Sequence, residues 1–172
     1  MTDAVALVRS YLSDAHWLLD RVVDGLADDH LHWVPPGTAN TIAATYAHVI
    51  GSEDVFVQEL LLGRRPLGED DWSGRTGISL PIPRRGADWL QWSRRVRIDA
   101  VAARAYASAV YAASDAYLTG LEPDALDRPP RAPVPGGQTL GWLVNNLLIG
   151  HAVLHGGEIA VLRGIQGLQG LP

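Results

Sequence analysis

Three polar side chains with the chemistry of a metal site lie close together near the C-terminal end of the chain. His151, His155 and Glu158 stand at positions i, i+4 and i+7. A helix places residues with this spacing on one side, and two imidazoles one turn apart can both reach a single metal ion. Burying the three groups without partners would cost roughly 1–3 kcal/mol for each of them. We therefore expect partners for all three, and a metal ion is the sharpest candidate.

An earlier amphipathic segment supplies another histidine, His48, towards one edge of its apolar face. Three neutral imidazoles suit Zn²⁺, Ni²⁺ or Fe²⁺ and leave coordination positions open to water or substrate. The H-E-x-x-H pattern of many metalloproteases is missing, because Ala152 stands where its glutamate would be. The alternative to a metal site is a structural cluster in which the histidines hydrogen-bond one another and the carboxylates.

Further polar residues lie in or beside apolar patterns. Glu53 falls within the apolar arc of the segment that carries His48, so it is either a partner for an inward histidine or a residue near a cleft. Asp99 interrupts another apolar stripe and is a further candidate. His16 lies beside a stripe and is expected to be a structural or surface histidine. His30 and His32, in a connector, are expected to be exposed.

Four amphipathic segments must position these side chains. Apolar residues recur at steps of three and four over residues 4–26, 41–62, 88–119 and 138–163, and Thr41 is expected to cap the second segment. A constant 100° per residue places five apolar residues of the last helix on the side of the histidines, namely Leu140, Val144, Leu147, Leu154 and Leu162. Proline- and glycine-rich connectors cover residues 63–86 and 121–137. The first of them is either a lid or binding loop, or a crossover between two helices.

The pattern predicts an all-α chain, a four-helix bundle with long connections between helices 2 and 3 and between helices 3 and 4. Its length of 172 residues favours one domain over residues 1–172. Five aromatic residues of the third helix exceed what one buried stripe needs, which favours a homodimer: Trp89, Trp92, Tyr106, Tyr111 and Tyr117.

Composition excludes several classes of function. The chain has no cysteine, which removes disulfides, thiolate ligands and a cysteine nucleophile. Its net charge of −5 disfavours a nucleic-acid surface. It lacks both a run of about 20 apolar residues and an export signal, so we expect a cytoplasmic protein without a membrane partner. All 14 basic residues are arginine, which indicates a GC-rich genome and leaves no lysine for Schiff-base chemistry.

The sequence resembles the DinB-like family over essentially its whole length. The resemblance rests on the runs Leu31-His-Trp-Val-Pro-Pro-Gly37, Thr41-Ile-Ala-Ala-Thr-Tyr-Ala-His48 with the following Glu53, His151-Ala-Val-Leu-His155-Gly-Gly-Glu158 and the ending from Leu162 to Pro172. It implies a four-helix bundle in which one histidine of the second helix and two of the last hold a divalent metal. The matching positions are His48, His151 and His155.

The resemblance also implies a class of chemistry. Some DinB-like proteins are metal-dependent transferases or isomerases that use glutathione, bacillithiol or mycothiol, among them the mycothiol-dependent maleylpyruvate isomerases, which carry a second domain after the bundle. We therefore expect a metal-dependent transferase with a low-molecular-weight thiol as cosubstrate, and the GC-rich character favours mycothiol. Glu53 and Glu158 are the candidate catalytic residues, as a base or as groups that orient a ligand. The alternative is a non-catalytic bundle that binds a metal or another small ligand.

Overall fold

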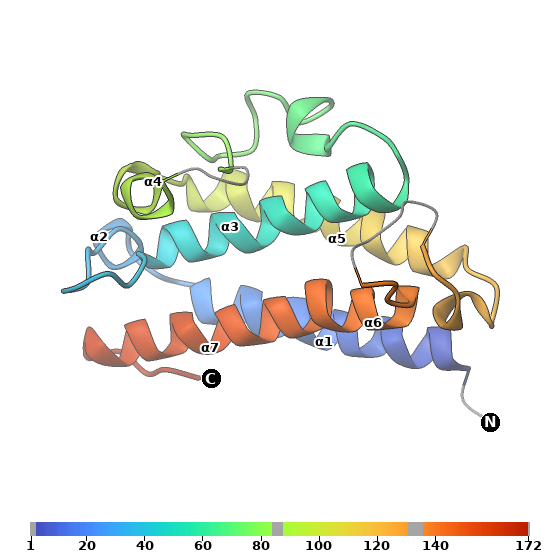
Figure 1. Cartoon of the computed structure of the whole chain (residues 1–172). Helices are drawn as coiled ribbons and strands as arrows, with labels where there is room; N and C mark the ends of the chain where they lie inside the picture. Colours follow the sequence, from blue (N-terminus) through green and yellow to red (C-terminus); the bar gives the residue numbers. More distant parts are fainter. Residues whose placement is uncertain (1–2, 84–87, 131–135, 172) are drawn as a thin grey trace.

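Helices make up most of the computed structural model, which describes residues 3–83, 88–130 and 136–171 (Figure 1). The α-helices are α1 Ala4–Val23, α2 Asp28–Leu31, α3 Ile42–Asp54, α4 Trp89–Arg95, α5 Ala100–Thr119, α6 Leu140–Val144 and α7 Gly150–Ile165. Short 3₁₀ turns cover Leu67–Glu69 and Ala125–Asp127, and an isolated antiparallel bridge joins Ile78 to Ile98. The predicted all-α class is confirmed. Residues 84–87 and 131–135, within or next to the two predicted connectors, lie outside the described residues.

Two of the long helices contain a π-helical segment. Val55–Leu61 continues α3, and Asn145–Ile149 joins α6 to α7, so that each becomes one long helical rod. The rods pack side by side with α1 and α5: α1 contacts α7, α7 contacts α3, α3 contacts α5, and α5 contacts α1 (Figure 1). The apolar core lies between these four partners. In the part of the chain that the structure describes, no helix is long and apolar enough to cross a bilayer.

Capping side chains begin the helices where the sequence pattern places them. The carboxylate of Asp3 accepts a hydrogen bond from the Val5 amide at 3.1 Å and begins α1. The hydroxyl of Thr41 accepts one from the Ala44 amide at 3.1 Å and begins α3, as predicted. Each cap satisfies a backbone N–H that has no partner within the helix.

The prediction of one long third helix is wrong, because the chain breaks between α4 and α5. Val96 and Asp99 have extended backbone, and the Asp99 carboxylate caps α5 by accepting from the Ala102 amide at 2.9 Å. The extended residues pair instead with the preceding connector: the Ser79 amide donates to the Arg97 carbonyl at 2.9 Å. The polar position in the apolar stripe is therefore a helix cap.

The predicted apolar arc of the last helix is wrong for two of its members. Leu147 is 40% exposed and Leu154 is 75% exposed, whereas Leu140, Val144 and Leu162 are buried. A π-helical segment accommodates an extra residue, so a constant 100° per residue fails across it. The segment Asn145–Ile149 therefore shifts Leu147 out of the predicted arc. Leu154 lies within the regular helix α7, on the side opposite the buried Ala152 and Ile159, so the predicted arc was centred too far towards that side.

The aromatic residues of α4 and α5 are mostly used within the chain. Trp92 and Tyr106 are buried, and the ring of Tyr111 stacks on that of His16 at 3.7 Å between centroids. These three aromatic residues are therefore not spare ones that could face a partner. The homodimer itself stays a prediction.

Candidate metal centre

His48 points from α3 into the interface with α7. It is half-buried, and its Nδ1 lies 3.1 Å from the hydroxyl oxygen of Ser52, one turn further along the helix. This contact leaves Nε2 facing α7, where it lies 3.0 Å from Nε2 of His151. The ring is therefore held at one nitrogen and presents the other to the second helix.

His151 and His155 stand one turn apart on the side of α7 that faces α3. Their ring centroids are 4.6 Å apart, and the centroid of His48 lies 4.8 Å from that of His151 and 5.1 Å from that of His155. One ring nitrogen from each histidine lies within 4.8 Å of the other two. The two helices therefore bring together the three histidines predicted as metal ligands.

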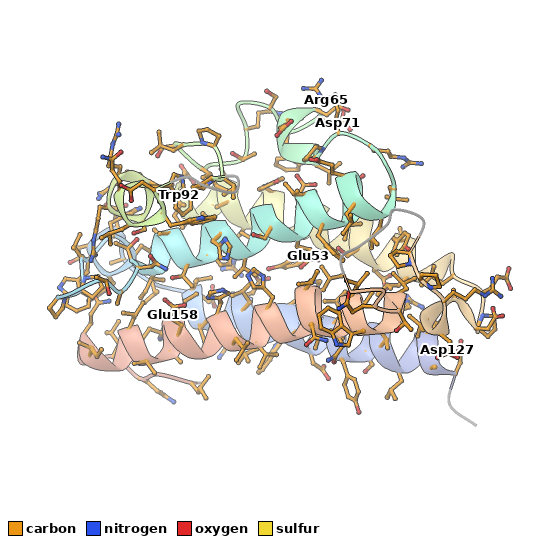
Figure 2. All side chains as sticks on the ribbon, viewed as in Figure 1. Glu53, Arg65, Asp71, Trp92, Asp127 and Glu158 are labelled. Carbon is orange, nitrogen blue, oxygen red and sulfur yellow. The ribbon has the colours of Figure 1, made fainter. Side chains whose placement is uncertain are left out.

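Glu158 contacts one of these histidines and not the centre of the cluster. Its carboxylate oxygen lies 2.8 Å from Nδ1 of His155, and Figure 2 shows Glu158 projecting from α7 towards α3. The hydrogen bond from His155 is the main reason that the pKa of Glu158 is lowered. A carboxylate bound to Nδ1 fixes the ring orientation and directs Nε2 towards the other histidines.

Burial keeps two of the three imidazoles neutral. The pKa of His48 is lowered to about 4, first by burial and then by the charges of His151 and His155. The pKa of His151 is lowered to about 4 as well, by burial and then by His155. Near neutral pH both rings therefore carry a free lone pair, which metal coordination requires.

The spacing of the ring nitrogens resembles that of ligands on one ion. Nitrogens about 2.0–2.1 Å from a common ion, at angles between octahedral and tetrahedral, lie about 2.9–3.4 Å apart. The 3.0 Å between Nε2 of His48 and Nε2 of His151 falls in this range, and a nitrogen of His155 lies within 4.8 Å of both. The donor set fits a divalent metal that accepts nitrogen.

Comparison with known proteins identifies the family of this chain. The sequence profile of the DinB superfamily matches residues 11–159. The chain belongs to the DinB superfamily. The matched range includes all three histidines of the cluster and both of the candidate carboxylates.

A solved structure shares the fold of this chain. The crystal structure of a conserved protein from Enterococcus faecalis superposes with a TM-score of 0.77 at 18% sequence identity, covering 97% of this chain and 99% of that chain. This likeness concerns the fold alone. No curated protein gives a significant match to the sequence.

Glu53, the other candidate carboxylate of this DinB chain, binds a different histidine. It is 1% exposed, its Oε2 lies 2.9 Å from Nε2 of His16, and its Oε1 accepts a hydrogen bond from the Ser114 hydroxyl at 2.5 Å. Glu53 was predicted to be either a partner for an inward histidine or a residue near a cleft, and the structure shows the first of these, with His16 as the histidine. Its charge also acts on the cluster, because it raises the pKa of His151 against the stronger effect of burial.

The remaining candidates lie away from the cluster. His32 is buried, and its Nε2 accepts a hydrogen bond from the Ile98 amide at 3.0 Å, so its predicted exposure is wrong. Ile98 lies between α4 and α5, so its amide has no helical partner and donates to His32 instead. His30 pairs with the exposed Asp29 at 3.7 Å, and Asp99 is the helix cap described above.

Sequence reasoning missed two residues beside the cluster. Trp89 packs the edge of its ring against His48, with 4.8 Å between centroids, although its position in the chain gives no sign of this contact. Ser52 follows His48 by four residues on the same helix face, and that spacing was the available signal for its hydrogen bond.

Proposed function

We propose that this DinB protein holds a divalent ion, Zn²⁺, Ni²⁺ or Fe²⁺, through His48, His151 and His155. The observation that carries the proposal is the convergence of three ring nitrogens from two helices, two of them on imidazoles kept neutral by burial. Ser52 and Glu158 support it, because each binds the Nδ1 of one histidine.

The proposed reaction is the transfer of a low-molecular-weight thiol, such as mycothiol, to an electrophilic carbon. A bound divalent ion supplies a Lewis acid that lowers the pKa of the thiol. In the overall reaction the thiol proton passes to water, a sulfur–carbon bond forms, and the leaving group departs with its bonding electrons. Since the protein lacks cysteine, the sulfur has to arrive on the cosubstrate.

The two candidate carboxylates take different proposed roles. Glu158 orients His155 through their 2.8 Å contact, and it is the nearer candidate for a base. Glu53 acts from a distance, because both of its oxygens are engaged by His16 and Ser114 while its charge reaches His151.

Metal analysis of the purified protein tests the ligand assignment. We expect stoichiometric divalent metal in the parent protein and loss of it in His151→Ala. His30→Ala is the matched control, because His30 pairs with an exposed carboxylate away from the cluster. Full metal content in His151→Ala would refute the ligand assignment. Absence of metal from the parent would favour the alternative, a structural cluster in which the histidines only form hydrogen bonds. The 3.0 Å contact between His48 and His151 is short enough for such a bond.

Turnover separates the transferase from a non-catalytic binding bundle. The metal-loaded protein is mixed with a chlorodinitrobenzene and, in turn, with glutathione, bacillithiol and mycothiol. We expect product with at least one thiol and none with His151→Ala. A metal-loaded protein that turns over none of the thiols would support the binding bundle instead.

A further inference from the structure

A large cavity lies beside His48, on the outer side of α3. It has a volume of about 1040 Å³, and Ser52 and Val55 line it at positions i+4 and i+7 from His48. Trp89 also lines the cavity while its ring edge contacts His48. Positions i+4 and i+7 share a helix face with i, so the cavity continues the face of α3 that carries a metal-centre histidine.

The described lining of this cavity is mostly apolar. The segment of residues 63–83, here called the strap, runs over the outer side of α3 and forms the opposite wall (Figure 1). Apolar side chains line both walls: Val55, Phe56 and Leu60 on the helix, and Ile78, Leu80 and Ile82 on the strap. Ligand pockets in proteins have this composition and volumes of about 300–1000 Å³, so the cavity has room for a whole small molecule.

Two fixed contacts hold the strap in place. The carboxylate of Asp54, which is 1% exposed, accepts hydrogen bonds from the amides of Leu67 at 2.9 Å and Gly68 at 2.8 Å and from the Tyr106 hydroxyl at 2.6 Å. At the other end, Ile82 packs directly on Gly51, where a β-carbon would come within 2.3 Å of its side chain. A pocket with walls fixed in this way binds a ligand without the cost of ordering a loop.

We propose that this cavity binds the hydrophobic body of the acceptor substrate, the electrophile that receives the thiol. This inference rests on the proposed transferase function. Ser52 and Trp89 connect the cavity to the histidine cluster, because both residues line the cavity and contact His48. A molecule with an aromatic or aliphatic body therefore fills the apolar space while its reactive carbon lies at the Trp89 end, next to the cluster.

Binding of the hydrophobic dye N-phenylnaphthylamine tests the cavity without any turnover. We expect the parent protein to bind the dye with increased fluorescence and Val55→Trp, which fills the cavity, to weaken binding by about tenfold or more. Leu60→Trp fills the same cavity from another position and replaces the first variant if that one does not fold. Val101→Trp is the matched control, because Val101 is 82% exposed on α5 and does not line the cavity. Circular dichroism establishes that each variant is folded.

The outcomes distinguish the cavity from the transferase reaction. In the turnover assay, Val55→Trp is expected to raise KM for the chlorodinitrobenzene and to leave KM for the thiol unchanged. If the folded Val55→Trp and Leu60→Trp proteins bind the dye as tightly as the parent, the proposal that this cavity binds a ligand is refuted. If both variants turn over substrate with an unchanged KM for the electrophile, the cavity is not the acceptor site, although the protein is still a transferase. Selective loss of dye binding without turnover of any thiol would uphold the cavity as a ligand site and refute the transferase.

Discussion

Replacing His16 with leucine is expected to destabilise the protein, because the buried carboxylate of Glu53 would lose a hydrogen-bond partner. Glu53 projects from α3 and is buried (Figure 2), and His16 of α1 and Ser114 of α5 form hydrogen bonds with its carboxylate. His16→Leu removes the first of them and leaves that carboxylate oxygen without a donor. Removing one partner of a buried pair costs about 3–5 kcal/mol. Because Ser114 still donates to the other oxygen, we expect about 3 kcal/mol.

The double variant His16→Leu, Glu53→Leu provides the internal test of this reasoning. It removes the polar groups together and puts apolar side chains of similar size in their place, a change that is often neutral or stabilising. Ser114 stays satisfied, because its hydroxyl also donates to the Val110 carbonyl at 3.2 Å. We therefore expect the double variant to recover most of the stability that the single variant loses.

Urea unfolding of the metal-free proteins near neutral pH measures these free energies. A loss of about 3 kcal/mol corresponds to a fall in Tm of roughly 6–12 °C for a chain of this size. His30→Leu is the control and is expected to stay within about 0.5 kcal/mol of the parent, as surface substitutions do. A single variant that loses less than about 1 kcal/mol, or a double variant less stable than the single one, would refute the argument.

Three further outcomes are expected. The pKa values of His48 and His151 are lowered from 6.5 to about 4, so the unfolded chain binds more protons than the folded one between these two values. The metal-free protein is therefore expected to be fully stable above about pH 6.5. Urea titrations at pH 5.5 should show a loss of about 1 kcal/mol per histidine in the free energy of unfolding. Glu158→Gln is expected to weaken metal affinity by about 10–100-fold in competition with a chelator, and unchanged affinity would show that it does not orient a ligand. Asp54→Ala is expected to release the strap, seen as faster amide exchange at Leu67 and Gly68 with α1 unchanged, and equal exchange rates would show that other contacts hold it.

The histidine cluster was predictable because it depends on local spacing. His151 and His155 are one turn apart on a helix that sequence periodicity identifies, and His48 stands on a second such helix. Packing of the two helices then brings the residues together. Glu53 was recognised as inward for the same reason, but its partner His16 comes from a third helix, and periodicity does not pair side chains between helices.

The errors arise where distant contacts override the local pattern. The stripe from α4 to α5 has an unbroken helical period, yet residues 96–99 are extended because they pair with the strap and with His32. The buried Asp54 was overlooked, since its partners are backbone amides of a loop that carries no residue-type signal. The exposed Leu147 reflects a change of helix type, which side-chain periodicity alone does not reveal. The exposed Leu154 lies in the regular helix α7, opposite the buried Ala152 and Ile159.

The π-helical segments have a consequence for chain length. Each of the two rods that carry the metal-centre histidines contains such a segment, after His48 in one and before His151 in the other. Because such a segment accommodates one extra residue, deleting one residue from Asn145–Ile149 would restore regular α-helix and leave Leu140 and His151 on the faces that they occupy now. The core and the histidine cluster would then both keep their places. Length differences of one residue among relatives that keep the cluster are therefore expected at these π-helical segments as well as in the connectors.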